Sequence, residues 1–239
     1  MSKIQYEIDG KIARITLDDG KVNAMNWEFF NELNEALDRT IADKAAALIF
    51  TSRPGVFSAG LDLKLLPTQD LAEQIRFQRK FAETMLRIYQ FPVPSIVAFT
   101  GHAIAGGVIL SSACDRIMIS DGPYTIQINE VANKMVIPSW ITLICRSSIP
   151  HQYWKEALLH STPYSPKEAY DIGIVDDLIE EGIDIMTPAN EYARKLVKLH
   201  TPAYAATKKF LRQEESAHVM EIFEKEFLDW RLNYSISDK

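Results

Sequence analysis

Residues 94–120 read PSIVAFTGHAIAGGVILSSACDRIMIS, and the rest of the chain is arranged around this stretch. Residues 95–99 form an apolar run rich in Ile and Val, which is typical of a buried strand. Gly106 and Gly107 follow, and residues 108–113 continue as an apolar helix. The unpaired N–H groups at a helix start suit a developing negative charge, and glycine lets a ligand approach them. A second interpretation is that the two glycines only let the helix and the strand pack closely.

The N-terminal part of the chain alternates between strand and helix patterns. Short alternating segments at 4–8 and 12–17 are joined through Asp9-Gly10, a strong hairpin signal. Asn26 is placed to cap a helix whose apolar residues recur at helical spacing. Residues 46–51 have the pattern of the next strand. This order of elements predicts an α/β fold.

A loop of small residues is expected at 57–64, where the chain reads FSAGLDLK. Ala59 and Gly60 expose backbone there with little side-chain cover. A long helix is expected over 70–89. Together, these features predict a second place at which a ligand can reach the main chain.

Two further strands are expected, one at the end of the opening stretch, at 116–120, and one just after it, at 124–128. The second of these strands delivers Asn129 and Glu130 at its end. A carboxylate at this position is a candidate for proton transfer, although a single Glu in a loop is usually a solvated charge.

The last part of the chain carries clear helix signals. Ser165 to Glu168 has the pattern of a capping box, with Gly173 as the stop, and a short strand is expected at 174–179. Helices are expected to open at Thr187-Pro188 and Thr201-Pro202, with a last helix over 219–234. We therefore expect a core domain over 1–186 and an appended helical segment over 187–239 that packs on the core or on a neighbouring subunit.

Composition excludes several classes of partner. The chain has 239 residues and a net charge of −6, which argues against nucleic acid because phosphate binding needs a basic surface. The five histidines are scattered and Cys114 and Cys145 lack metal-type spacing, so neither a metal site nor a disulfide framework is expected. We find no secretory signal, membrane-spanning run or targeting address, and we expect a cytoplasmic protein that does not bind membranes.

Five motifs, in order along the chain, resemble the crotonase superfamily of enoyl-CoA hydratases and isomerases. They are KVNAMN at 21–26, FSAGLDLK at 57–64, GHAIAGG at 101–107, CDRIMIS at 114–120 and INEVANKMVIP at 128–138. The resemblance covers residues 4–179. It implies a superhelix of repeated ββα units, a helical C-terminal segment used in trimerisation, and a homotrimer or a dimer of trimers. It also implies an acyl-CoA thioester as the substrate, with no separate cofactor.

The resemblance also implies which groups hold the thioester. In the family, each of the two glycine-containing turns lends one backbone N–H to the thioester oxygen, and the matching amides here are those of Ala59 and Gly106. Donors of this kind stabilise the enolate charge where it develops. The residues implied in substrate binding are Ala59, Gly60, Leu61, Asp62, Leu63 and Gly106. A plainer role for Asp62 is to cap the helix that follows it.

The number of glutamates at the site distinguishes hydratases from isomerases within the family that this sequence resembles. Hydratases resemble one another in having two glutamates, and the first of these positions is Ile109 in this chain, whereas the second is Glu130. Hydration should therefore be poor, because activating water and delivering a proton are normally shared between two groups. Moving a double bond from position 3 to position 2 needs one base, and the stretch around Glu130 also resembles the family's isomerases.

Glu130 suits this role if apolar surroundings raise its pKa toward neutrality. The expected sources of those surroundings are Ile109, Ile126, Ile128 and Val131. Lys134 stands where many relatives carry glycine, and an ion pair with Glu130 would lower that pKa and weaken the base. Lysines that could meet the phosphates of CoA, or simply lie on the surface, are Lys21, Lys64, Lys208 and Lys209.

The sequence therefore predicts a 3,2-trans-enoyl-CoA isomerase of fatty acid β-oxidation, with Glu130 as the single proton shuttle. Two alternatives stay open. One is an enoyl-CoA hydratase or another crotonase-type hydrolase or decarboxylase that uses the same oxyanion hole. The other is a noncatalytic acyl-CoA-binding protein.

Overall fold

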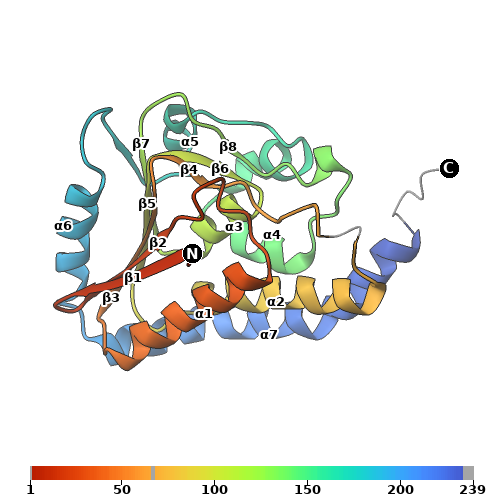
Figure 1. Cartoon of the computed structure of the whole chain (residues 1–239), viewed down its shortest axis with the longest axis horizontal. Helices are drawn as coiled ribbons and strands as arrows, with labels where there is room; N and C mark the ends of the chain where they lie inside the picture. The colour runs from red at the N-terminus through yellow and green to blue at the C-terminus, as the bar shows by residue number, and fades with distance from the viewer. Residues whose placement is uncertain (1, 66–67, 234–239) are drawn as a thin grey trace.

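A computed structural model describes residues 2–65 and 68–233, and these residues form an α/β fold (Figure 1). The strands are β1 Ile4–Asp9, β2 Ile12–Leu17, β3 Ala47–Ser52, β4 Gly55–Ser58, β5 Ser95–Phe99, β6 Gly101–Ile104, β7 Arg116–Ser120, β8 Ile126–Gln127 and β9 Asp177–Ile179. The helices are α1 Trp27–Ala42, α2 Leu71–Tyr89, α3 Gly106–Ala113, α4 Ser139–Cys145, α5 Pro166–Asp171, α6 Met186–Leu196 and α7 Thr201–Asn233.

The strands form two sheets. The larger has the order β1-β2-β3-β5-β7-β9, with β1 and β2 antiparallel and the other neighbours parallel. The smaller is the parallel sheet β4-β6-β8. Along the chain, each pair β3–β4, β5–β6 and β7–β8 gives one strand to each sheet and is followed by a helix. This arrangement confirms the predicted superhelix of repeated ββα units.

Both faces of the large sheet are buried at its central strands β3 and β5, which explains their continuous apolar runs. Ile49 and Ile96 pack with Ala189 of α6 on one face. Their neighbours Phe50 and Val97 point into the main core on the other face. Figure 1 shows α6 on one side of the sheet, with α3 and α4 on the other.

The first local predictions are confirmed. The β1–β2 hairpin turns at Gly10, which has a positive φ of 57°. The side chain of Asn26 accepts the N–H of Phe29 at 3.0 Å and so caps α1. At the other end of the chain, Ser165 and Glu168 form the predicted capping box of α5.

Two strands and one helix were not predicted from the sequence. Residues 55–58 form β4 where a loop was expected from 57, and 101–104 form β6. Both strands are short and obtain their hydrogen bonds from distant segments. Gly101 allows this pairing, because a Cβ atom on it would lie 2.4 Å from the backbone nitrogen of Val56. Helix α4 at 139–145 lies in a stretch with no predicted element.

The two helices expected over 201–234 are one helix, α7, over Thr201–Asn233. No Gly or Pro follows Pro202 in this stretch, so nothing interrupts the backbone hydrogen bonds. Residue 234 of the expected last helix lies outside the described residues. Helix α6 begins at Met186, just before the expected Thr187-Pro188.

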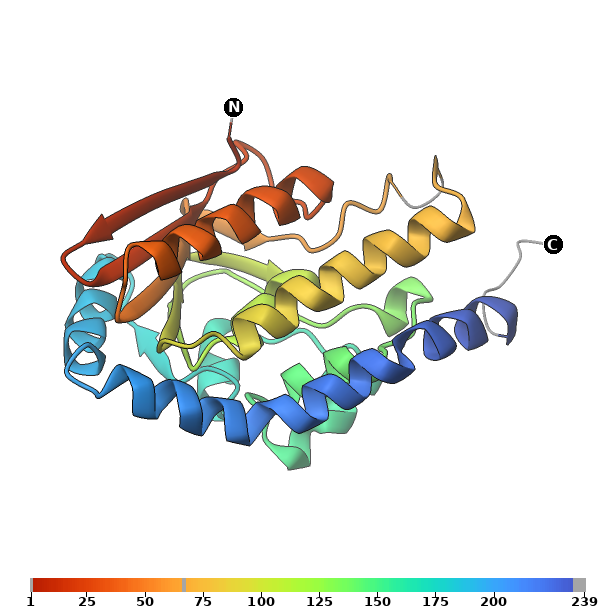
Figure 2. The ribbon, with the colours of Figure 1, turned by 90° about the horizontal axis from the view of Figure 1, so that it is seen from below.

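Helix α7 packs along the molecule rather than away from it. Figure 2 shows α1, α2 and α7 running alongside one another with α2 between, and α7 also contacts α4. The division into a core over 1–186 and a segment over 187–239 stays a prediction. Among the residues described, no helix combines the length and the apolar character needed to span a lipid bilayer.

Candidate active site

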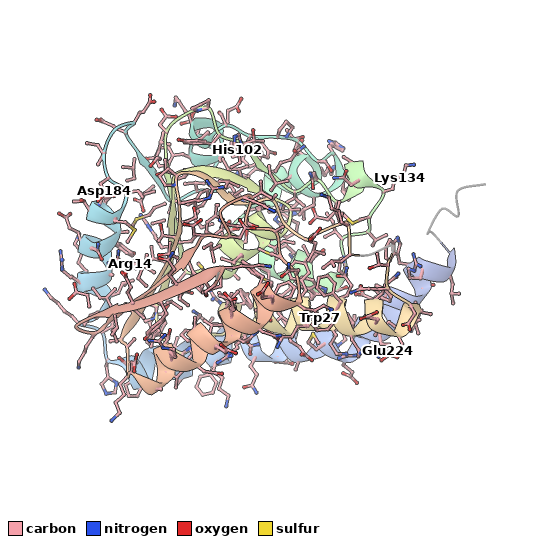
Figure 3. The ribbon with its side chains drawn as sticks, in the orientation of Figure 1. Arg14, Trp27, His102, Lys134, Asp184 and Glu224 are labelled. Carbon is pink, nitrogen blue, oxygen red and sulfur yellow. The ribbon has the colours of Figure 1, made fainter. Side chains whose placement is uncertain are left out.

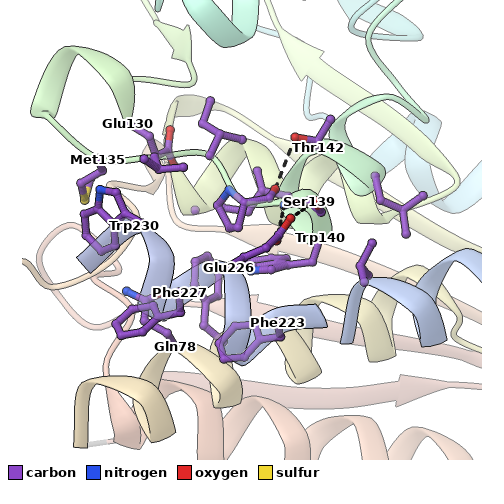
Figure 4. Close-up of a pocket in the computed structure, with 18 of the residues that line it drawn as sticks. Gln78, Glu130, Met135, Ser139, Trp140, Thr142, Phe223, Glu226, Phe227 and Trp230 are labelled. Carbon is purple, nitrogen blue, oxygen red and sulfur yellow. Dashed lines mark hydrogen bonds between the residues drawn. The ribbon is translucent and has the colours of Figure 1, made fainter. Parts of the chain in front are cut away.

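A cavity of about 900 Å³ lies where the loop after β4, the start of α3, the turn after β8, α4 and the second half of α7 meet. Its lining includes Ala59, Leu61, Leu63, Gly106 and Glu130, five of the residues expected at the site. Aromatic side chains form much of the remaining wall, and Figure 4 shows Trp140, Phe223, Phe227 and Trp230 among them. The cavity therefore joins bare backbone and the Glu130 carboxylate to a largely aromatic wall, and polar side chains such as Arg146, His218 and Glu226 also line it.

The two glycine-containing turns touch each other. A Cβ atom on Gly60 would lie 2.9 Å from the backbone nitrogen of Gly106, and Gly60 has a φ of +83°. A Cβ atom on Gly107 would lie 2.6 Å from the carbonyl oxygen of Ser58. Close packing therefore requires Gly60 and Gly107. The second interpretation of the sequence included this role for Gly107, and the same packing brings the Gly106 amide to the cavity.

The Gly106 N–H is available to a ligand. Gly106 is the first residue of α3, and its N–H has no acceptor among the residues described. The preceding residue, Ala105, has a φ of +49° and donates its own N–H to the carbonyl oxygen of Gln127 at 2.8 Å. An unpaired N–H at a helix start is a suitable donor to an anionic oxygen.

The second backbone N–H that is free to hold an oxyanion is not the expected one. The Ala59 N–H donates to the carbonyl oxygen of Val22 at 3.0 Å, so it is not free to hold an oxyanion. On the next stretch, the Met25 N–H donates to the Gly60 carbonyl at 2.8 Å and the Asp62 N–H to the Met25 carbonyl at 3.0 Å.

These two bonds form a parallel bridge between Met25 and Leu61. N–H groups alternate in direction along an extended segment, so the Leu61 N–H lies on the side of the chain that faces away from Met25. It has no acceptor among the residues described. Leu61 therefore replaces Ala59 as the available amide, and no local sequence signal distinguishes the two.

Glu130 lies three residues after the last residue of β8, at the start of the 3₁₀ turn Val131–Asn133 (η2). It is 6% exposed, and its Oε2 atom has no hydrogen-bond partner among the described residues. Burial raises the pKa of its carboxyl group to about 7. The side chain is therefore a base that can take up and release a proton near neutral pH.

The burial of the four apolar residues expected around Glu130 agrees in part with the expectation. Ile109, Ile126 and Ile128 are buried, whereas Val131 is 43% exposed. Ile109 in α3 has an apolar side chain with no proton to give or take.

Lys134 does not neutralise Glu130. It is exposed, and no ion pair joins it to Glu130 in the described part of the chain. Figure 3 shows Lys134 at the edge of the molecule. Its φ of +60° explains why glycine suits this position.

Two other expectations are wrong. Asp62 does not cap α2, because Asp70 does so by accepting the Glu73 N–H at 2.8 Å. Asp62 instead accepts the Lys64 N–H at 3.2 Å within its own turn. Lys208 is buried and its Nζ lies 2.6 Å from Asp115, so it is not available to a phosphate. Lys21, Lys64 and Lys209 are exposed.

Comparison with known proteins places this geometry in a family. The family model described as enoyl-CoA hydratase/isomerase matches residues 7–229. The rat protein named enoyl-CoA delta isomerase 1, mitochondrial, is 32% identical over 74% of this chain, and the alignment spans 63% of that relative's length.

Two solved structures resemble the whole fold. Human mitochondrial delta3-delta2-enoyl-CoA isomerase has a TM-score of 0.91 at 27% identity, covering 98% of this chain and 92% of that one. An enoyl-CoA hydratase from Mycobacterium ulcerans has a TM-score of 0.87 at 31% identity, covering 94% of this chain and 99% of that one. The chain belongs to the enoyl-CoA hydratase/isomerase family.

Proposed function

We propose that this enzyme moves the double bond of a 3-enoyl-CoA to the 2-trans position. One observation carries the proposal: Glu130, whose carboxylate is the buried one among the described residues that line the cavity, faces the same space as the N–H groups of Leu61 and Gly106, which have no acceptor there. A hydratase would need a second proton-transfer group, and Ile109 stands at the position where such enzymes carry it. The named relatives include both isomerases and hydratases, so the support comes from the site rather than from the overall likeness.

In this mechanism, the carboxylate of Glu130 removes a proton from C2 of the acyl chain. The electron pair of that C–H bond forms a dienolate, and its negative charge lies on the thioester oxygen. The N–H groups of Leu61 and Gly106 stabilise this oxygen, each by about 3 to 4 kcal/mol. Protonated Glu130 then returns the proton to C4. The C3–C4 double bond becomes a single bond, C2–C3 becomes double, and the enzyme regains its starting state.

The aromatic wall of the cavity suits the acyl chain. Phe81 and Trp140 meet edge to face with ring centroids 4.8 Å apart, and Phe223 on α7 is 3% exposed. Burying the acyl chain there excludes water from the dienolate. This property supports isomerisation over hydration, and it agrees with a role in the β-oxidation of unsaturated fatty acids.

The test compares two substrates and one variant. We expect the purified protein to isomerise 3-hexenoyl-CoA faster than it hydrates crotonyl-CoA. Glu130→Gln should lower the isomerisation rate by roughly 10² to 10⁴-fold, the usual contribution of a general base. The dissociation constant for hexanoyl-CoA should change little, because Gln keeps the shape of Glu. Faster hydration of crotonyl-CoA would favour a hydratase, and tight binding with no turnover would favour a noncatalytic protein.

We further propose that three copies assemble through the C-terminal helical segment. Phe210 and Leu211 on α7 are 84% and 71% exposed, and large apolar side chains exposed together often mark an interface. Light scattering should give the mass of three or six chains. A monomer at micromolar concentration would contradict this assembly.

A further inference from the structure

One oxygen of the Glu130 carboxylate, Oε2, is free of hydrogen bonds in the described part of the chain, which suits a base that must reach two carbon atoms. The main chain of this residue is held, because the Glu130 carbonyl oxygen accepts the N–H of Asn133 at 3.0 Å and of Met135 at 2.8 Å. The position of the base therefore depends on how this turn is attached to the rest of the protein.

One neighbouring segment, residues 161–164, attaches to the chain on both sides of Glu130. On the N-terminal side, Ile126 and Tyr164 exchange two backbone hydrogen bonds of 2.9 and 3.0 Å. The Gln127 side-chain Nε2 donates to the carbonyl oxygen of Ser161 at 2.7 Å. On the C-terminal side, the Ala132 N–H donates to Ser161 Oγ at 3.2 Å. Ser161 thus contacts the chain before and after the base.

The same hydrogen bonds also connect Glu130 to the Gly106 N–H, the proposed oxyanion donor. The carbonyl oxygen of Gln127 accepts the Ala105 N–H at 2.8 Å, and Ala105 directly precedes Gly106. A continuous series of hydrogen bonds therefore runs from the start of α3 through Gln127 and Ser161 to the turn that carries Glu130. We call this series the Gln127–Ser161 brace.

Ser161 has an unusual backbone conformation. It is 5% exposed and has a φ of +52°, a region that residues other than glycine rarely adopt. It follows the π-helical segment Lys155–Leu159, and such segments are frequent at functional sites. A strained conformation of this kind persists only when its surroundings determine it.

We propose that Ser161 and Gln127 are positioning residues that set the place of the Glu130 carboxylate relative to the Gly106 N–H. The inference rests on the proposed role of Glu130 as the base, and it assigns neither residue a contact with the substrate. A displacement of about 1 Å at a reacting group can cost roughly a hundredfold in rate, so a brace of this kind has a measurable effect.

The experiment uses three variants of the full chain. Ser161→Ala removes the hydroxyl and keeps the strained backbone, Ser161→Gly removes the hydroxyl and relieves the strain, and Gln127→Met removes the side-chain donor. We expect each variant to lower kcat for 3-hexenoyl-CoA by roughly ten- to hundredfold, with KM changed less than twofold. The acid limb of the pH profile should shift to lower pH, because a looser turn admits water to Glu130. Circular dichroism gives the folded fraction to which each rate is normalised.

Ser165→Ala is the matched control. Its Oγ accepts the Glu168 N–H at 3.3 Å, so this variant also loses a serine hydroxyl that accepts a backbone N–H, but at the start of α5. We expect it to keep the wild-type kcat and pH profile.

The outcomes separate the brace from the proposed function. Wild-type kcat and pH profile in the three variants, with Glu130→Gln inactive, would overturn the brace and leave the isomerase mechanism intact. A wild-type rate for Ser161→Gly, with only Ser161→Ala impaired, would also overturn it, because the hydroxyl would then have no part. An active Glu130→Gln variant would overturn the proposed function and the brace with it.

Discussion

Glu130 combines deep burial with a carboxylate oxygen that accepts no hydrogen bond from the described residues. Burial disfavours the charged form, and without a cation beside it the pKa rises from 4.5 to about 7. A carboxylate with this pKa accepts a carbon-bound proton more readily than an ordinary one and still releases it within the catalytic cycle. The proposed proton shuttle therefore depends on one residue and on its burial.

This pKa predicts how activity depends on pH. Only the ionised form of Glu130 can remove the C2 proton, so kcat/KM for 3-hexenoyl-CoA should fall about tenfold for each pH unit below 7. Above that value it should reach a plateau. Initial rates between pH 5 and 9 test this expectation. A profile that is flat down to pH 5 would mean that Glu130 keeps an ordinary pKa or does not act as the base.

The same group predicts how stability depends on pH. A folded-state pKa of about 7 against 4.5 unfolded means that Glu130 takes up a proton on folding between these values. Its contribution is fully present below pH 4.5 and is lost as the pH rises through 7. Glu130→Gln should therefore be more stable than the wild type at pH 8.5, by about 3 kcal/mol, with the difference shrinking toward pH 5.

Urea unfolding of both proteins at pH 5 and 8.5 measures this difference. A variant that is less stable than the wild type at pH 8.5 would contradict the burial of an unpaired carboxylate at this position.

At the scale of elements, the contact between the loop after β4 and the start of α3 positions the two amide donors. Gly60→Ala should push these segments apart, because its Cβ would lie 2.9 Å from the Gly106 nitrogen. We expect kcat/KM to fall by roughly a hundredfold, the usual cost of losing an oxyanion donor. Isomerase kinetics at saturating and limiting 3-hexenoyl-CoA measure the change.

Gly182→Ala is a control with the same backbone requirement. Gly182 has a φ of +85°, close to the +83° of Gly60, but no atom lies within 4 Å of a Cβ placed there. Both variants should lose about 1 to 2 kcal/mol of stability through left-handed strain. Equal kinetic losses in the two variants would show that strain, rather than displacement of the donors, causes the effect at Gly60.

The elements that sequence patterns predict well are those that carry their own signals. Helices α1 and α2 have a strong apolar period and side-chain caps, and β5 is an apolar run between punctuating residues. Strands β4 and β6 have only four residues each and depend on partners far along the chain. Four residues are too few for the alternation of apolar and polar side chains to distinguish a strand from a loop.

At the scale of the whole molecule, α7 is anchored at one end and shapes the cavity at the other. The anchor is Asp115, whose carboxylate accepts Ser95 N–H at 2.9 Å, Tyr204 Oη at 2.8 Å and Arg212 at 2.9 Å, and pairs with Lys208 at 2.6 Å. Burial opposes the charge of Asp115, but Lys208 and Arg212 outweigh it and hold its pKa below the usual value.

Further along α7, Glu226 accepts the Ser139 N–H at 3.1 Å, and its other carboxylate oxygen accepts the Ser139 hydroxyl. These contacts attach the aromatic wall of the cavity to the start of α4, as Figure 4 shows. The acyl chamber therefore depends on how α7 lies on the core.

Asp115→Ala tests the anchor. The variant would leave Lys208, which is 4% exposed, as a buried charge without its partner. We expect a loss of about 3 to 5 kcal/mol in the free energy of unfolding. Asp171→Ala, which breaks the exposed pair with Lys167, should cost far less, because water screens an exposed pair. Urea unfolding at pH 7 measures both, and similar small losses would mean that the Asp115 cluster does not hold α7.

The sequence by itself determined the fold class and the order of the motifs, and it predicted Glu130 as the base, because each depends on residues close together along the chain. Glu130 and the apolar Ile109 are visible in the sequence without any coordinates. The tertiary structure alone decided that Leu61 rather than Ala59 has the free amide, and that Lys134 forms no ion pair with Glu130 among the described residues. Hydrogen-bond direction and burial depend on segments that meet only after folding, such as Val22 with Ala59 and Gln127 with Ser161.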